Sequence, residues 1–255
     1  MQNNLDLKKN DGYLFNIIIP LFNAEKYIEN CLKSIIKQSY IKYQVKIVDD
    51  CSTDDSFEIA SSICSQHKQF SIIRNSRRVG ALKNIHDLLC NKIEEPPKTV
   101  DILIDGDDYL YSGDVLNIIN EKYLKTNCLI TYGSHLSSNG VQGKKYPYLI
   151  REFNLYRKYF WYASHLKTFR HDLWMSISPN DLLDKNGEYF KVAWDLAIMF
   201  PLLEMAGKRQ EFVNEVLYVY NDQNPLNDYK IRRKDQILAA KEIRRKVKYR
   251  RINLI

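Results

Sequence analysis

Short apolar runs alternate with amphipathic segments through the first part of the chain, and this alternation restricts the possible fold more than any other feature. The runs are rich in β-branched residues and cover residues 14–19, 45–48, 70–74 and 100–104. Between them, apolar side chains recur at helical spacing in residues 25–38, 56–65 and 81–89. Strands and helices that alternate in this way predict a mostly parallel sheet with helices on both faces.

The second half of the chain has a less regular pattern. Its predicted helices and strands cover residues 115–124, 128–132, 193–206 and 212–220, and its polar segment, predicted as a loop, covers 134–148. Residues 161–174 are rich in aromatic and polar side chains and are assigned no element, and the tail from residue 228 is predicted to form a basic, amphipathic helix. The sequence therefore predicts an α/β fold with a Rossmann-like sheet and a mixed second half.

The composition bounds the class of protein. The formal net charge is +7, with much of the excess between residues 232 and 251. Such a balance suggests a polyanionic partner, and a solvated helix face is the commoner explanation. The five cysteines form no Cys-x-x-Cys pair, which predicts free thiols in a reducing compartment. Because the N-terminus is polar and no apolar run is long enough to span a bilayer, we expect a cytoplasmic protein.

Three carboxylates follow the fourth apolar run, in the stretch ILIDGDDY at residues 102–109. Like charges this close repel each other and raise each other's pKa, so they do not stabilise a strand end by themselves. One interpretation is an exposed turn whose aspartates cap the next helix. The other is a site for Mg²⁺ or Mn²⁺, which prefer carboxylate oxygens. The position at a strand end favours a cation site at Asp105, Asp107 and Asp108.

Other polar groups also follow predicted strands, namely Asn23, Asp49–Asp50 and the segment 77–80. In open α/β sheets, ligands bind at the carboxyl ends of the strands. A carboxylate at Asp50 could accept hydrogen bonds from a base N–H or a ribose hydroxyl. Because the chain has neither a dinucleotide fingerprint nor a P-loop, we expect phosphate to be neutralised by the metal and by Lys83 or Arg77.

Five segments of the chain resemble glycosyltransferase family 2, whose members have the GT-A fold. In the family's order they are IIIPLFNAEKYIENCLKSIIKQS, IVDDCSTDDS, VGALKN, LIDGDD and WDLAIMFPLLEMAG. The resemblance implies a single GT-A domain at 14–222, with a nucleotide-binding half at 14–112 and an acceptor and catalytic half at 113–222. Residues 1–13 are then a flexible tail, and residues 223–255 are a loop and a basic helix.

The resemblance also implies a reaction: a sugar moves from a nucleotide-diphosphate sugar, most often UDP-linked, to an acceptor hydroxyl, with inversion and with Mn²⁺ or Mg²⁺ bound. Asp195 falls where the family has its catalytic base, and Trp194 replaces the acidic residue that usually precedes it. The D-x-D element corresponds to Asp105, Asp107 and Asp108, which would hold the metal and contact the ribose. The residues expected to bind the donor nucleotide are Pro20, Phe22, Asn23, Asp50, Lys83, Asp105, Gly106 and Asp107.

Aromatic and polar side chains near Asp195 are candidates for sugar contacts. A lone histidine is more often a packed or capping residue than a ligand, whereas aromatic faces stack on sugars and histidine can bind hydroxyls or phosphate. We expect Trp161, His165 and Trp194 to contact the acceptor or the donor sugar. An apolar surround would raise the pKa of Asp195 and suit it to act as a base, and an N-cap aspartate would occupy the same position.

Two other functions fit parts of the sequence. A nucleotidyltransferase acting on sugar phosphates would use a similar sheet, but it usually has a glycine-rich basic loop where this chain has PLFNAEKY. A non-catalytic basic module for membrane or nucleic acid would use the tail, but the acidic clusters would repel phosphate and no nucleic-acid motif is present. We expect a glycan, lipid-linked or protein acceptor, no nucleic acid, and peripheral membrane contact through the basic C-terminal helix.

Overall fold

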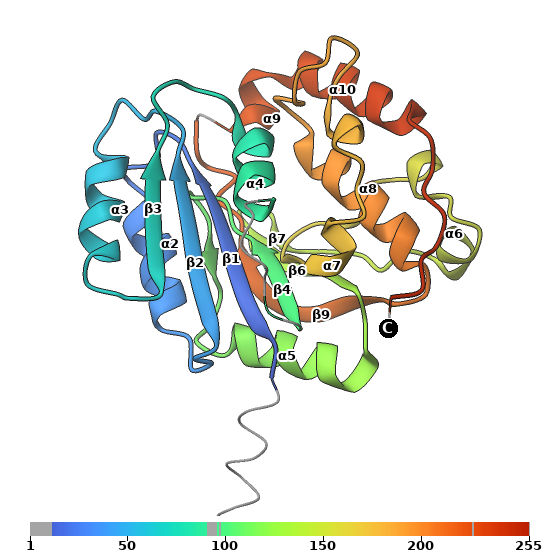
Figure 1. The fold of residues 1–255 in the computed structure, drawn as a ribbon, viewed down its shortest axis with the longest axis horizontal. Coiled ribbons are helices and arrows are strands. Elements are labelled where there is room, and N and C mark those ends of the chain that lie inside the picture. The colour runs from blue at the N-terminus through green and yellow to red at the C-terminus, as the bar shows by residue number, and fades with distance from the viewer. Residues whose placement is uncertain (1–11, 91–95, 97, 226, 255) are drawn as a thin grey trace, which may run out of the picture.

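The predicted alternation of strands and helices is present in the first half of the chain (Figure 1). The computed structural model describes residues 12–90, 96, 98–225 and 227–254, so most of the predicted N-terminal tail, residues 1–11, lies outside the described residues. Strands β1 to β4 span Leu14–Leu21, Tyr43–Asp49, Phe70–Arg74 and Thr99–Leu103. Helices α2, α3 and α4 span Ile28–Ile36, Ser56–Cys64 and Ala81–Leu89.

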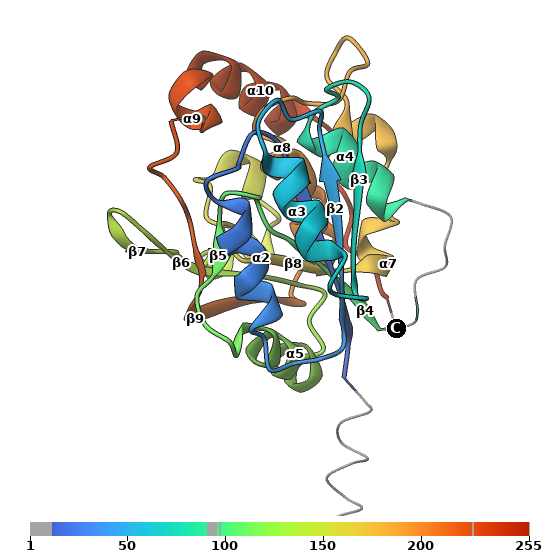
Figure 2. The same cartoon turned by 90° about the vertical axis from the view of Figure 1, so that its left-hand side faces the viewer.

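Strand β1 lies inside the parallel part of the sheet. Ile17 pairs with Val45 of β2 on one side and with Ile102 of β4 on the other, and β2 pairs in parallel with β3. Because successive side chains of a strand point to opposite faces, Ile17 and Ile19 pack in one core cluster with α2 and α3, whereas Ile18 packs in another with α4. Helices therefore cover both faces, as the two views show (Figures 1 and 2).

The second half extends the same sheet with strands in both directions. Over the described residues the strand order is β3-β2-β1-β4-β8-β6-β9-β5, and β7 pairs with β6. Strand β8 is antiparallel to β4 and to β6, β6 is parallel to β9, and β5 is antiparallel to β9. Strands β5 to β9 span Tyr109–Leu110, Ile130–Ser137, Gly140–Gln142, Lys167–Arg170 and Gln210–Val219. The predicted α/β fold with a mixed second half is thus confirmed.

Helix α8 lies in the interior of this half, where it packs against α7, α10, η1, η2 and β6, and its residues are mostly apolar. Every residue of α8 from Leu196 to Ala206 is buried. The α-helices α5 to α10 span Val115–Thr126, Tyr148–Glu152, His171–Trp174, Trp194–Ala206, Asp228–Ile231 and Arg233–Arg245, and the 3₁₀ helices η1 and η2 span Tyr156–Lys158 and Pro179–Leu182. None of the described helices, α8 included, is long and apolar enough to cross a membrane.

One expectation for the second half was wrong, and one segment without an assigned element contains two. Residues 134–148 are not a loop throughout, because β6 continues to Ser137 and β7 pairs back onto it. Their polarity misled because Ser134 and His135 are buried on an interior strand between β8 and β9, where they border the site described below. The segment 161–174, which was assigned no element, contains β8 and α7.

A buried ion pair fastens the C-terminal segment to the second half. Arg157 of η1 donates from Nε and Nη2 to the two carboxylate oxygens of Glu204 in α8, at 2.6 and 3.0 Å. Arg157 Nη1 also donates to the carbonyl oxygen of Ile243 in α10 (2.6 Å), and the N–H of Tyr249 donates to Glu204 Oε2 (2.9 Å). Figure 1 shows α10 and the segment after it beside α8. Every group of this pair is satisfied, so it links four parts of the chain.

Removing the charge of Glu204 should destabilise the fold strongly. Glu204→Gln leaves the buried guanidinium of Arg157 without its carboxylate, and we expect the free energy of unfolding to fall by about 3–5 kcal/mol. Urea denaturation measures this change. Glu121→Gln is the matched control, because Glu121 pairs with Lys125 on the exposed surface of α5, where the expected loss is about 0.5 kcal/mol. Equal losses in the two variants would contradict the prediction.

Candidate active site

The acidic stretch forms a tight loop at the end of β4. The N–H of Asp108 donates to the carbonyl oxygen of Asp105 (3.0 Å), and the N–H of Asp105 donates to the hydroxyl of Tyr218 on β9 (3.1 Å). Gly106 packs closely on β1, where a Cβ would lie 3.0 Å from Leu21 Cδ1, so this approach favours glycine. Strands β1 and β9 therefore hold the loop from two sides.

Asp107 and Asp108 have different surroundings. Asp108 is buried; its Oδ1 accepts the N–H of Asn221 (2.7 Å), and its Oδ2 has no hydrogen-bond partner among the described residues. Asp107 Oδ2 accepts from the side-chain amide of Asn224 (2.6 Å). Burial raises the pKa of both carboxyls, and the charges of Asp105 and Asp107 raise that of Asp108 further. A buried, unpartnered carboxylate oxygen beside like charges is a position that a cation would stabilise.

His165 lies beside these carboxylates because of the direction of β8. Leu103 of β4 stands opposite Lys167 in an antiparallel pair, so the chain two residues after Leu103 comes next to the chain two residues before Lys167. Those positions are Asp105 and His165. The ligand atoms of Asp105, Asp108 and His165 all lie within 4.8 Å of one another. The structure thus brings His165, predicted as a sugar contact, to two of the three predicted metal ligands.

The ring of His165 is held between aromatic side chains. Its centroid lies 4.6 Å from that of Tyr218 and 5.2 Å from that of Tyr220, both nearly parallel. Its Nδ1 is buried without a hydrogen-bond partner among the described residues. Burial lowers the pKa of His165 well below its ordinary value, so the ring is neutral, which is the form that ligates metals. Two carboxylates and one imidazole could therefore hold a divalent cation here.

Lys167 is buried on β8, where it stands opposite Leu103 of β4 and its side chain reaches Trp194 at the start of α8. Its side chain makes no hydrogen bond or ion pair with any residue that the structure describes, and its Nζ lies 5.2 Å from the ring centroid of Trp194. Asp195 follows in the first turn of α8 and is half-buried. Burial raises the pKa of Asp195, and the charge of Lys167 opposes this shift; the same charge adds to burial in lowering the pKa of His165. The positive charge of Lys167 therefore favours the ionised form of Asp195 and the neutral form of His165.

Asp50 holds the loop that leads into α4. Its carboxylate accepts from the side chain of Asn75 (2.9 Å) and from the N–H groups of Val79 (2.9 Å) and Gly80 (2.8 Å). Gly80 has φ +97°, a backbone conformation that suits glycine. Although burial acts to raise the pKa of Asp50, these hydrogen bonds lower it below its ordinary value. The carboxylate predicted to bind the base therefore also orders its own loop.

Phe22 and Arg78 meet next to Asp50. The guanidinium carbon of Arg78 lies 3.6 Å from the ring centroid of Phe22, and its Nε lies 4.0 Å from Asp50 Oδ2. Pro20 lies in β1 two residues before Phe22 and is half-buried. Asn23 has φ +47°, and its side-chain oxygen accepts the N–H of Thr53 at 2.9 Å. The structure thus gathers Phe22, Arg78 and Asp50 at one edge of the sheet, where Asn23 shapes the turn.

Lys83 and Trp161 have other neighbours. Lys83 pairs with Asp87, one turn further along α4, and its Nζ lies 5.6 Å from the ring centroid of Tyr189. Trp161 packs edge-on against Phe200 of α8, with the centroids 5.4 Å apart. None of these contacts is with a residue of the acidic loop, and the roles assigned to both residues stay predictions.

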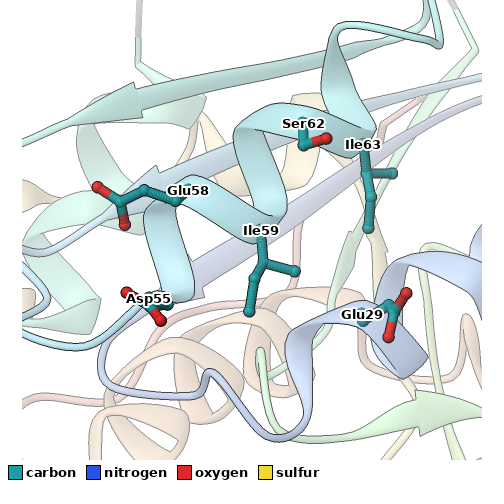
Figure 3. Close-up of a pocket in the computed structure, with 6 residues that line it drawn as sticks. All are labelled: Glu29, Asp55, Glu58, Ile59, Ser62 and Ile63. Carbon is teal, nitrogen blue, oxygen red and sulfur yellow. The ribbon is translucent and has the colours of Figure 1, made fainter.

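A surface groove between α2 and α3 is separate from the strand-end residues. It is lined by Glu29, Asp55, Glu58, Ile59, Ser62 and Ile63. Figure 3 shows Glu29 on α2 and Ile59 and Ile63 on α3, with the carboxylates of Asp55 and Glu58 nearby. Three acidic side chains would repel a nucleotide diphosphate, so this groove does not suit a donor.

Sequence reasoning missed Lys167 and His135, whose ring centroid lies 5.5 Å from that of His165. Each is a single polar residue outside any motif, whereas Arg78 belongs to the strand-end segment 77–80, in which Arg77 was named for phosphate. Lys167 and His135 are buried in short strands whose other buried residues are mostly apolar or small. A polar residue buried in such a strand is the signal that could have marked them, because a buried charge needs a partner or a function.

Comparisons with known proteins identify the family. Residues 16–177 match Glycosyl transferase family 2. Glycosyltransferase GlyG of Streptococcus pneumoniae is 25% identical over 143 residues, which are 56% of this chain and 42% of GlyG. Poly(ribitol-phosphate) beta-N-acetylglucosaminyltransferase TarS of Staphylococcus aureus is 28% identical over 142 residues, which are 52% of this chain and 22% of TarS. The chain thus spans less than half the length of these curated relatives.

Solved structures show the same fold. S. aureus TarS 1-349 in complex with UDP-GlcNAc has a TM-score of 0.61 at 21% identity and covers 82% of this chain and 59% of its own. Mannosyltransferase PcManGT from Pyrobaculum calidifontis, in complex with GDP-Man and Mn²⁺, has a TM-score of 0.58 at 18% identity and covers 89% and 62%. The fold is therefore GT-A, and the chain belongs to glycosyl transferase family 2, a family of glycosyltransferase enzymes. The matched stretch ends before Asp195.

Removing the charge of Asp50 should loosen the loop before α4. Asp50→Asn is expected to lower the free energy of unfolding by about 1.5–3 kcal/mol near neutral pH, because an amide replaces a charged acceptor of two N–H groups. The folded-state pKa of Asp50 lies below its ordinary value of 3.8, so this stabilisation is present above that pH and is lost as the pH falls through the folded value.

Urea denaturation of both proteins at about pH 7 and about pH 3 checks this prediction. The difference between wild type and variant should be smaller at the lower pH, because Asp50 is largely protonated in the unfolded chain below its ordinary pKa of 3.8. A difference that stays the same at both values would contradict the assigned role of the carboxylate.

Proposed function

We propose that this protein is an inverting, metal-dependent glycosyltransferase that moves a sugar from a UDP-linked donor to an acceptor hydroxyl. The observation that carries the proposal is the cluster of Asp105, Asp108 and His165 at the end of β4, next to β8 with Lys167, whose Nζ lies 5.2 Å from the Trp194 ring centroid beside Asp195. Family membership supports the reaction class. The complexes of TarS with UDP-GlcNAc and of PcManGT with GDP-Man support a nucleotide-sugar donor.

The donor set at the acidic loop fits a divalent cation. Asp108 Oδ2 and His165 Nδ1 are buried without partners among the described residues, which is costly unless a ligand satisfies them. Asp105, Asp108 and His165 would hold the ion, and the imidazole nitrogen favours Mn²⁺ over Mg²⁺. When bound, the cation would neutralise charge on the leaving diphosphate. Asp107, which accepts from Asn224, would instead hold the loop at 221–224 over the site.

Asp195 is proposed to act as the general base. The acceptor oxygen bonds to the anomeric carbon as the bond between that carbon and the diphosphate oxygen breaks, and the acceptor proton passes to the Asp195 carboxylate. A single displacement from the opposite face inverts the configuration. Burial raises the pKa of Asp195 and so makes it a stronger base, while Lys167 favours the ionised form that must accept the proton.

The acceptor stays a prediction from the sequence, namely a hydroxyl of a glycan, a lipid-linked molecule or a protein. Peripheral membrane contact through the basic helix also stays a prediction. One side of α10 carries exposed Leu238 at helical spacing from exposed Lys234, Lys241 and Arg245. Unlike these exposed basic residues, Arg244 of the same helix makes contacts within the protein: its Nη1 donates to the carbonyl oxygens of Arg157 and Tyr159 at 2.8 and 2.9 Å.

Loss of either buried ligand should weaken metal binding. We expect His165→Ala and Asp108→Asn to lower the affinity for Mn²⁺ by about tenfold or more, because each removes a donor atom from a preformed set. Calorimetric titration with Mn²⁺ measures this, with His67→Ala, which changes a histidine beside Phe70, as the control.

Thermal shift with UDP and GDP, each with and without Mn²⁺, tests which donor nucleotide the protein binds. The proposal fails if neither nucleotide stabilises the protein with Mn²⁺ present.

Asp195→Asn should separate binding from chemistry. We expect turnover to fall by about 10²- to 10⁴-fold while UDP affinity stays unchanged, because the amide cannot accept the proton. Release of UDP from UDP-sugars in the presence of acceptor measures turnover. In the wild type, activity should rise with pH through the pKa of Asp195, which lies above its ordinary value of 3.8. Undiminished turnover in the variant would place the base elsewhere.

A further inference from the structure

The contacts that Lys167 makes within the protein do not explain why this lysine is buried. Only 3% of its surface is exposed, and it makes no hydrogen bond or ion pair with any described residue. Arg157, which is buried to a similar degree, has the carboxylate of Glu204 and the carbonyl oxygen of Ile243 as partners. A buried cation that makes no ion pair costs free energy, so stability does not account for Lys167.

The surroundings of Lys167 place its ammonium group inside the site. Its backbone stands opposite Leu103, two residues before the acidic loop, and its Nζ lies 5.2 Å from the ring centroid of Trp194, next to Asp195. The group that reacts must lie between the proposed cation ligands and the proposed base. Lys167 therefore lies where the diphosphate and the anomeric carbon of a bound donor would meet.

We propose that Lys167 binds the donor diphosphate and stabilises the negative charge that develops on it as the sugar leaves. This inference rests on the proposed function and adds the residue that opposes the metal ligands across the leaving group. The ligand is of the nucleoside diphosphate class, whose phosphate oxygens would form the ion pair that Lys167 lacks among the described residues. Lys167 then has the role for which the sequence offered Lys83 or Arg77, and Lys83 pairs with Asp87 instead. The bond that breaks joins the anomeric carbon to the diphosphate oxygen, and both electrons go to that oxygen.

Lys167→Met tests this role because methionine has a similar length and no charge. Calorimetric titration in the presence of Mn²⁺ should show UDP affinity lower by about 10- to 100-fold, as expected for loss of a charge-assisted hydrogen bond, and a smaller loss for UMP. Without ligand, the variant should unfold at a urea concentration equal to or above that of the wild type. Lys125→Met, which removes an exposed lysine paired with Glu121, is the control and should leave UDP affinity unchanged.

Lys167→Gln serves as a second variant that removes the charge and keeps a polar side chain. Wild-type protein that binds neither UDP nor GDP with Mn²⁺ would overturn the proposed function itself. Wild-type protein that binds UDP, together with variants that bind it equally well, would overturn only the role of Lys167. Lower stability without ligand, combined with unchanged UDP affinity, would assign Lys167 a structural role and would also overturn the inference.

Discussion

The pairing of β4 with β1 on one side and with β8 on the other decides where the charged groups of the site meet. Because β1 and β2 run parallel to β4, the loop that carries Asp50 lies at the same edge of the sheet as the acidic loop. Because β8 runs antiparallel, its beginning lies at that edge. His165 and Lys167 therefore face residues from the first half of the chain. One change of strand direction thus brings the two halves of the domain together.

Some buried charged groups at this edge of the sheet have no partner among the described residues, whereas the buried ion pair of α8 is fully satisfied. Arg157 and Glu204 satisfy each other and two backbone groups, and such a pair holds its elements in one arrangement. By contrast, Asp108 has a buried carboxylate oxygen without a partner, and Lys167 has no counter-ion among the described residues. A dianionic ligand with a divalent cation would satisfy both. Unsatisfied buried charges of this kind are expected at a binding site, because satisfying them contributes to the free energy of binding the ligand.

The sequence predicted the strands and helices of the first half well, because their apolar periodicity and their order determine a parallel sheet. It also placed Asp50, the acidic loop and Asp195 at the ends of elements. It could not predict β8, since four residues with a buried lysine and threonine do not alternate as a strand usually does. Without β8, the partner and direction of β4 were unknown, and so were the neighbours of His165 and Lys167. Long-range pairing, not local propensity, decides these contacts.

The antiparallel contact between β4 and β8 also has a consequence for how the molecule folds. The acidic loop and His165 are far apart along the chain, so closing this contact requires a long loop to be ordered first. The parallel strands β1 to β4 could form from neighbouring segments, but the cation ligands could not gather until β8 had paired with β4. Complete ligation at the acidic loop would therefore report that this long-range pairing has formed.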